Sequence, residues 1–380
     1  MFSFTEEQKL LISSVSALAK EHLAPKAEEI DETEGFNHIA FQKMAELGLL
    51  GITADEKYGG AQLGALESTL VMEKLAEACA STTLSYLAHT ILCVNNIHAN
   101  ASEPQKQKYL PKLISGEWLG AMAMTEPEAG SDALGLTTRA VKKGNKYILN
   151  GAKTYITNGP GGNIFVVYAK TGPTRKDIST FIVESTFPGF KVSKKLKKMG
   201  MRGSPTAELA FIDCEVPVEN LIGKENDSIS HMMKNLNLER ITISGISLGI
   251  AAACLNYSSR FVQERTQFGK PLAHFQMIQE RIAEMATELD AGRALCYAAA
   301  QKFDSGDSDP TLGAKCKLFT AQMGTRAGLE AIQLLGGAGY MKEYPVERYM
   351  RDAKLLEIGA GTNEVMRIII AKSLLNLKEK

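Results

Sequence analysis

The sequence has no excess of charge of either sign. Its 380 residues include 43 Lys and Arg and 43 Asp and Glu, so the formal net charge at pH 7 is zero. Non-specific binding to nucleic acid depends on a basic surface that displaces counterions from the phosphates. The composition therefore argues against a nucleic-acid partner.

Long apolar runs and a secretory leader are also lacking. The longest apolar stretch, Ile243 to Cys254, is too short for a membrane span, which needs about twenty residues. The first ten residues, MFSFTEEQKL, have neither the basic start nor the apolar segment of a signal peptide. We expect no membrane span and a cytosol-like location, either bacterial cytoplasm or, for a mature organelle form, the mitochondrial matrix.

Cysteine is scarce and widely spaced. The six cysteines, at positions 79, 93, 214, 254, 296 and 316, are never closer than fourteen residues apart. This spacing excludes CxxC metal and redox motifs, and the six histidines form no HExxH pattern. We expect reduced, mostly buried thiols and no metal site.

What the sequence does contain falls into three regions. The first 120 residues have helical periodicity, beginning with an amphipathic run that Thr5 caps and that stops near Pro25. Further helices are expected over 39–47, 66–80, 83–99 and 104–114.

Between Gly120 and Asn226 the pattern changes to short strands, because β-branched residues alternate and Gly and Pro punctuate them. Strands are predicted over 146–150, 164–169, 180–183, 190–193 and 208–212. Turns are predicted at Asn150-Gly151, Asn158-Gly159-Pro160 and Pro188-Gly189. Such short strands favour an antiparallel sandwich or barrel. A Rossmann nucleotide site is not expected, because no Walker loop or strand-following GxGxxG is present.

From Ser228 onward the predicted helices are long, over 228–262, 274–305, 311–335, 345–357 and 362–376, with apolar faces suited to a bundle. The predicted fold class is α+β multidomain. We expect an N-terminal helical domain (1–121), a central antiparallel β-barrel domain (122–226) and a C-terminal helical bundle (227–380).

Four segments carry chemical information. They are AMAMTEPEAGSD (121–132), NGAKTYITNG (150–159), ERTQFGKPL (264–272) and QLLGGAGYMKEYPVERYMRDAKLLEIGAGTNEVMRI (333–368). By composition alone the first would be an ordinary surface turn, but in this order and spacing the four resemble the acyl-CoA dehydrogenase family over essentially the whole chain. The resemblance implies N-terminal helices, a β-barrel, a four-helix bundle, non-covalent FAD and α,β-dehydrogenation of acyl-CoA thioesters.

The resemblance also implies flavin contacts within one subunit. Segment 122–131 would lie along the isoalloxazine ring, with Thr125 hydrogen-bonding the ring and Ser131 touching the CoA. Tyr155, Ile156 and Thr157 would cover the other side, with the Thr157 hydroxyl near N5. The alternative for Tyr155 is a strand aromatic packed into the barrel. The full set in these two segments is Met122, Met124, Thr125, Gly130, Ser131, Tyr155, Ile156 and Thr157.

Other cofactor contacts are implied across a subunit boundary and at the last helix. Arg265 and Phe268 match positions that reach the FAD diphosphate and adenosine of a neighbouring subunit, and Arg suits a diphosphate because it donates bidentately. Further matches are Gln276, Gln333, Gly336 and Gly337, and, where the last helix begins, Thr362, Asn363 and Glu364.

The catalytic base is where this sequence departs from many relatives. The family often has Glu directly before the Gly-Thr of the last motif, but here that position is Ala360. The sequence offers Glu239 instead, in Asn237-Leu238-Glu239-Arg240, and this arrangement resembles the isovaleryl-CoA dehydrogenase branch. The alternative is that Glu239 is a solvated carboxylate beside Arg240.

The same resemblance implies the substrate contacts. The Ala360 N–H would polarise the thioester carbonyl, with Gly359 and Gly361 beside it. Ser131 and Asn237 would contact the CoA part, Asn237 weakly because relatives often have Asp there, and Arg240 would either hold the CoA or order the site. The missing carboxylate leaves room for a branched acyl chain, so isovaleryl-CoA is the first candidate substrate.

Several alternatives stay open at this stage. They are a dehydrogenase for straight-chain or other acyl-CoA, a non-catalytic CoA- or flavin-binding paralogue, and an oxidase. The implied partners are an electron-transferring flavoprotein and three further copies of the chain in a homotetramer.

Overall fold

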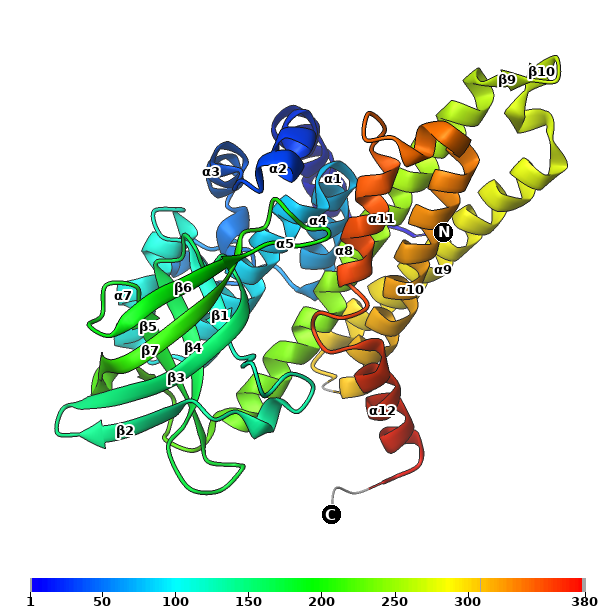
Figure 1. The fold of residues 1–380 in the computed structure, drawn as a ribbon. Helices are drawn as coiled ribbons and strands as arrows, with labels where there is room; N and C mark the ends of the chain where they lie inside the picture. Colours follow the sequence, from blue (N-terminus) through cyan, green and yellow to red (C-terminus); the bar gives the residue numbers. More distant parts are fainter. Residues whose placement is uncertain (1, 308, 378–380) are drawn as a thin grey trace.

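The computed structural model describes residues 2–307 and 309–377. In chain order these residues form helices, then a β-sheet, then long helices (Figure 1), as the sequence predicts.

The N-terminal helices begin with a cap that the sequence predicts. The Thr5 hydroxyl accepts a hydrogen bond from the Gln8 amide at 3.2 Å, and the Gln8 side chain accepts one from the Thr5 amide at 3.1 Å. Two details differ from expectation. The chain becomes helical again after Pro25, as α2, and the helix expected over 83–99 contains a π-helical stretch, Ala88–Val94. The helices are α1 Glu6–Leu18, α2 Ala27–Thr33, α3 His38–Glu46, α4 Ala65–Ala78, α5 Ala80–Leu87, α6 Asn95–Asn100 and α7 Glu103–Ile114.

The central region is one sheet in the order β6-β7-β3-β2-β4-β5-β8, with β1 beside β4. All five predicted strands are present. The sheet differs from the expected antiparallel barrel in two ways, because β1 and β2 pair with β4 in parallel and the strand order does not close. The strands are β1 Gly120–Ala123, β2 Arg139–Lys143, β3 Lys146–Thr157, β4 Ile164–Lys170, β5 Ile178–Glu184, β6 Phe190–Leu196, β7 Thr206–Pro217 and β8 Leu221–Ile222.

One predicted turn is wrong. Asn150-Gly151 does not end a strand but lies inside β3, where the register against β7 shifts. Gly151 has φ 149°, and a Cβ there would come within 2.5 Å of the Thr138 hydroxyl. The hairpin with β2 turns at residues 144 and 145 instead, where Gly144 supplies the positive φ of 62°. An Asn-Gly pair fits a bulge as well as a turn, so the dipeptide alone did not distinguish the two.

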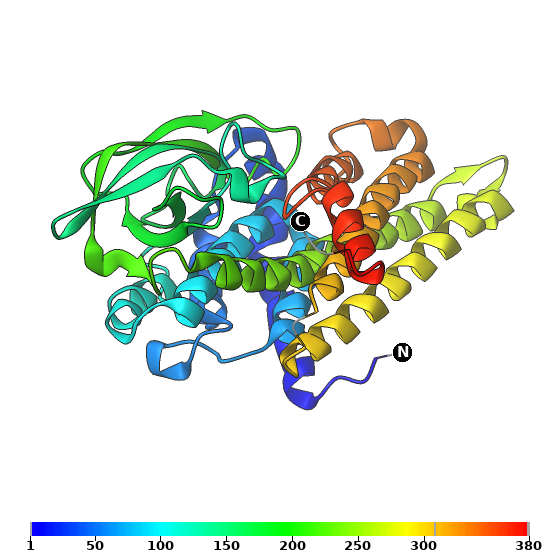
Figure 2. The same cartoon turned by 90° about the horizontal axis from the view of Figure 1, so that it is seen from below.

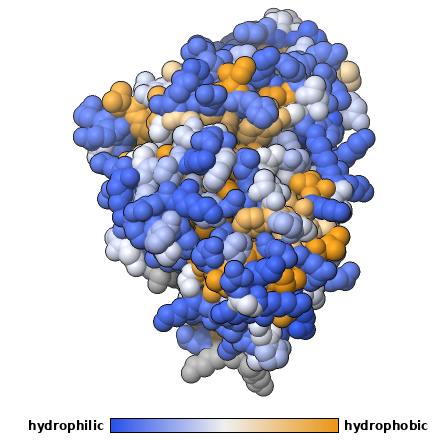
Figure 3. Space-filling model, turned by 90° about the vertical axis from the view of Figure 1, so that its left-hand side faces the viewer, coloured by the Kyte–Doolittle hydropathy of each residue, from blue (hydrophilic) through white to orange (hydrophobic). Residues whose placement is uncertain are grey.

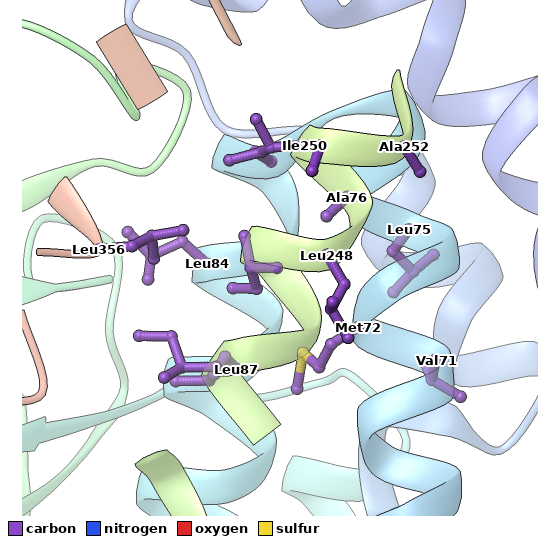
Figure 4. Close-up of a cluster of buried hydrophobic side chains, with 14 of the residues drawn as sticks. Val71, Met72, Leu75, Ala76, Leu84, Leu87, Leu248, Ile250, Ala252 and Leu356 are labelled. Carbon is purple, nitrogen blue, oxygen red and sulfur yellow. The ribbon is translucent and has the colours of Figure 1, made fainter. Parts of the chain in front are cut away.

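Helix α8 joins the N-terminal helices to the bundle. Its Gly245 and Gly249 allow close approach to α4, because a Cβ at either would lie within about 2.5 Å of a backbone oxygen of Thr69 or Glu73. Figure 4 shows Leu248 of α8 packed against Met72 and Leu75 of α4. The C-terminal elements are α8 Ser228–Glu264, β9 Thr266–Gln267, β10 Lys270–Pro271, α9 Gln276–Asp304, α10 Pro310–Leu335, α11 Val346–Leu355 and α12 Asn363–Leu374.

By length and composition α8 could cross a membrane, but 94% of its most apolar window is buried inside the protein. The helix is thus a core element, running through the middle of the molecule between the sheet and the bundle (Figure 2). The six cysteines are also buried and none forms a disulfide, as the sequence predicts.

Candidate active site

The two segments predicted to flank a flavin lie side by side. The Thr154 amide donates to the Thr125 carbonyl at 2.9 Å, and the Lys153 ammonium donates to the Met124 carbonyl at 3.0 Å. The end of β3 is thereby fastened to the loop that follows β1. In Figure 1 the loop after β1 lies on the side of the sheet that is turned towards α12.

A buried ion pair fixes this junction. Lys153 donates to Glu126 at 2.8 Å, and Glu126 also accepts the Thr137 and Thr138 amides at 2.6 and 3.0 Å. Burial opposes ionisation of Glu126, but Lys153 and the hydrogen bonds lower its pKa to about 2. Burial lowers the pKa of Lys153 to about 8. Sequence reasoning missed both residues, although each is a charged side chain within a recognised motif.

Tyr155 points outward. The register against β7 shifts between Lys153 and Ile156, and within this bulge Tyr155 has φ 58° and is 71% exposed. The alternative of a tyrosine packed into the barrel is therefore wrong. The Ile156 side chain joins the buried core of the sheet and its carbonyl accepts the Gly159 amide at 3.0 Å, whereas Thr157 is half-buried.

The loop after β1, like Tyr155, is partly open to solvent. Met122, Met124 and Thr125 are half-buried, whereas Gly130 and Ser131 are exposed. Nothing in the described chain lies within 4 Å of a Cβ built on Gly130, so packing within the chain does not require glycine there. The loop can therefore approach a flat ligand closely, as expected.

Glu239 is buried in the first half of α8 and is not solvated. Its residue exposure is 6%, and within the described residues its Oε2 has no hydrogen-bond partner. Burial raises the pKa of Glu239 to about 7, although the charges of Arg240 and Lys317 favour the carboxylate. The alternative of a solvated surface carboxylate is wrong. A carboxylate with a raised pKa and an unpartnered oxygen is suited to accept a proton.

The loop between α11 and α12 is held by Arg240 and Lys317, the two cations that act on the Glu239 carboxylate. Arg240 donates from Nε to the Ala360 carbonyl at 3.3 Å, and Lys317 donates to the Gly361 carbonyl at 2.6 Å. Ala360 has φ 56°, a left-handed conformation that is strained for a non-glycine residue. In the described part of the chain its N–H donates to no acceptor. The loop thus presents a free Ala360 amide and is held by the two cations that also act on the Glu239 carboxylate.

The start of α12 and residue 237 complete this part of the structure. The Thr362 hydroxyl caps α12 by accepting the Val365 amide at 3.3 Å. Asn363 is buried, and within the described part of the chain its Nδ2 has no partner. Glu364 is exposed and pairs with Arg367. Asn237 donates to the Asp309 carbonyl at 3.3 Å, and its buried Oδ1 has no partner among the residues that the structure describes.

The remaining predicted cofactor residues lie elsewhere. They are at the end of the bundle farthest from the sheet, near β9 and β10, in both views (Figures 1 and 2). All are exposed, and Phe268 is 92% exposed. One chain does not bring these residues to the flavin-facing segments, so they are available to another molecule. The set is Arg265, Phe268, Gln276, Gln333, Gly336 and Gly337.

Comparison with known proteins agrees with this geometry. Sequence models of the acyl-CoA dehydrogenase N-terminal, middle and C-terminal domains match residues 5–117, 121–214 and 227–375. The chain belongs to the acyl-CoA dehydrogenase family and is an oxidoreductase. This confirms the resemblance and the fold that it implied.

Particular relatives narrow the comparison. The mitochondrial isovaleryl-CoA dehydrogenase of Pongo abelii is 46% identical over 375 residues, covering 97% of this chain and 89% of the relative. Butyryl-CoA dehydrogenase of Megasphaera elsdenii superposes with a TM-score of 0.96 at 38% identity, covering 99% of this chain and 100% of that one. The FAD complex of PigA superposes with a TM-score of 0.95 at 30% identity, covering 98% and 99%.

Proposed function

We propose that this protein is an FAD-dependent dehydrogenase that converts isovaleryl-CoA to 3-methylcrotonyl-CoA, with Glu239 as the base. One observation carries the proposal. Among the described residues, the buried Glu239 carboxylate has a raised pKa and an Oε2 without a partner, and its neighbour Arg240 holds the loop where Ala360 replaces the family's usual glutamate. The 46% identity to an isovaleryl-CoA dehydrogenase supports the substrate.

The residues present fit FAD. An exposed tyrosine on a strand bulge and an open glycine loop offer two surfaces for a flat ring. The N-terminal end of α12, whose helix dipole favours negative charge, suits an anionic diphosphate. FAD, when bound, supplies the acceptor for the hydride that leaves the β-carbon.

Glu239 would take the proton from the α-carbon. Only the carboxylate can do so, and a pKa of about 7 makes a substantial fraction of it ionised at neutral pH while keeping its proton affinity high. An exposed glutamate would be ionised but a weaker base. The burial of Glu239 is therefore the source of its reactivity.

Ala360 would stabilise the charge that develops when the α-proton leaves. That charge collects on the thioester oxygen, and the amide of Ala360 has no competing acceptor in the described chain. Arg240 and Lys317 donate hydrogen bonds to the carbonyls of Ala360 and Gly361. Because these bonds fix the loop, the Ala360 amide need not move as charge appears on the thioester oxygen.

A straight-chain substrate is the second candidate, because the chain is also similar to a butyryl-CoA dehydrogenase. Pocket contacts to one methyl group discriminate by only about 10- to 200-fold. We therefore expect the branched thioester to be preferred and straight chains of similar length to be turned over more slowly.

The experiment is a substrate panel with an artificial electron acceptor. We expect isovaleryl-CoA to give the highest kcat/KM among isovaleryl-, butyryl- and hexanoyl-CoA. A higher value for butyryl-CoA would overturn the substrate assignment but not the chemistry. Flavin that is not bleached by any acyl-CoA would identify a non-catalytic binder, and hydrogen peroxide release would identify an oxidase.

We further propose a homotetramer that passes electrons to an electron-transferring flavoprotein. The exposed set near β9 and β10 would complete the FAD site of a neighbouring subunit. Four apolar side chains on α12 and just after it are each more than half exposed, which favours a contact between copies. They are Ile368, Leu374, Leu375 and Leu377.

On the side of the molecule shown in Figure 3, hydrophilic residues predominate, with scattered apolar ones.

A further inference from the structure

Lys317 is a buried lysine on the face of α10 that meets α8. It is 2% exposed, and its ammonium donates to the Gly361 carbonyl at 2.6 Å and to the Asn363 side-chain oxygen at 3.3 Å. No carboxylate oxygen of the described residues lies within 4.0 Å of this ammonium. Burying a charge without a close counter-ion costs free energy, so side-chain packing alone does not explain why a lysine occupies position 317.

The two acceptors of Lys317 both belong to the segment that carries Ala360. Arg240 of α8 holds the Ala360 carbonyl, and Lys317 of α10 holds the next carbonyl and the Asn363 side chain. Two cations from two helices thus fix a short loop whose alanine has a left-handed conformation. Such a conformation persists only when its surroundings hold it.

Lys317 also acts on Glu239 through its charge. The groups that face Glu239 are Arg240 on its own helix, Lys317 on α10 and the Tyr168 phenol on β4. Lys317 is in turn influenced by Glu357 and Glu364 as well as by Arg240. Of these groups, Arg240 and Lys317 are the cations, and both favour the ionised carboxylate.

We propose that Lys317 is a positioning residue for the reaction: its ammonium holds the Ala360 loop in place and its charge favours the carboxylate form of Glu239. This inference rests on the proposed function, since it assumes that Glu239 and the Ala360 amide act on the thioester. It assigns to α10 a part in the chemistry, whereas the motifs point only to α8 and the last loop.

The two roles can be separated with three variants. Lys317→Gln keeps a donor but removes the charge, Lys317→Arg keeps the charge but alters the donor geometry, and Lys317→Met removes both. The control is Lys315→Met, because Lys315 lies on the same helix but is exposed. The measurements are flavin content, kcat and KM for isovaleryl-CoA, and the pH dependence of kcat/KM.

The acid limb is the fall of kcat/KM at low pH. We expect Lys317→Gln to move this limb about one pH unit higher, because loss of a nearby positive charge disfavours the carboxylate form of Glu239. Lys317→Arg should leave the limb in place and lower kcat roughly tenfold, because the loop amide is held less well. Lys317→Met should show both changes, with a kcat reduced about 100-fold, KM changed less than kcat, and flavin retained. Lys315→Met should match wild type throughout.

An unmoved acid limb in Lys317→Gln would overturn the electrostatic role, and an unchanged kcat in Lys317→Met would overturn the positioning of the loop. If Lys317→Met does not fold, the Gln and Arg variants decide the two roles separately. Failure of the proposed function is distinguishable, because Glu239→Gln would then retain turnover. If Glu239→Gln is inactive and the limb of Lys317→Gln is unmoved, only the charge effect assigned to Lys317 is wrong.

Discussion

Two buried glutamates in this protein have opposite properties. Glu126 in the β-region forms an ion pair with Lys153 and accepts hydrogen bonds from two backbone amides, and its pKa falls to about 2. Glu239 in α8 has an oxygen with no partner in the described chain, and its pKa rises to about 7. Burial is similar in both, at 3% and 6% exposure, so the difference lies in the partners. A satisfied carboxylate holds structure together, and an unsatisfied one is available for chemistry.

The largest effect that tests this comparison is expected for Glu239→Gln. Turnover of isovaleryl-CoA should fall by at least about 10³-fold, because the amide cannot accept the α-proton. Flavin content and CoA binding should remain near wild type, because the change is nearly isosteric. Steady-state assays with an artificial acceptor measure the loss, and Glu284→Gln, an exposed glutamate on α9, is the matched control. Turnover within a few-fold of wild type would remove Glu239 from the mechanism.

Glu126→Gln should instead damage the fold. Lys153 would be left buried without its counter-ion, which costs about 3–5 kcal/mol when one partner of a buried pair is removed. Chemical denaturation should show that loss, together with weaker flavin retention. The paired replacement Glu126→Leu with Lys153→Met should be less harmful than Glu126→Gln alone. Equal stability of Glu126→Gln and wild type would mean that the ion pair does not brace the flavin-facing segments.

The same glutamine at position 239 should stabilise the protein at alkaline pH. The folded-state pKa of Glu239 is raised, so folding is favoured while the group is protonated, below its unfolded value of about 4.5. That contribution is lost as pH rises from about 4.5 through about 7. At about pH 8 we expect Glu239→Gln to unfold with a free energy roughly 1–3 kcal/mol above wild type, and the gap should narrow towards about pH 5. A gap that widens on acidification would contradict the raised pKa.

The smallest stability effect is expected for Tyr155→Ala. The ring is 71% exposed, so the free energy of unfolding of the flavin-free protein should change by less than about 0.5 kcal/mol. The affinity for FAD should nevertheless fall, measured by flavin release on dilution. A loss of stability above about 2 kcal/mol would show that the tyrosine packs within the protein after all.

The sequence predicts the fold well because its signals are local. The Thr5 cap, the long apolar helices and the alternating strands each depend on neighbours in the chain. The errors occur where tertiary contacts decide. Asn150-Gly151 forms a bulge because β3 continues against β7. The outward Tyr155 agrees with the resemblance, although no alternation pattern reveals the second bulge that turns it outward.

The candidate site could be predicted only in part for the same reason. The motifs identify Glu239 and Ala360 but give no role to Lys153, which lies within one of them, or to Lys317, which lies outside them. Their role becomes visible only when burial and the two loop acceptors of Lys317 are known. A lysine at an apolar position of a long helix is the one signal that could have indicated it.

The pH dependence of kcat/KM for isovaleryl-CoA tests the central claim most directly, because it reports the essential base of the free enzyme. If Glu239 is that base, kcat/KM should fall about tenfold per unit of pH below an apparent pKa near 7. A value that stays constant down to about pH 5 would contradict the account, because the base would then have the properties of an ordinary exposed carboxylate.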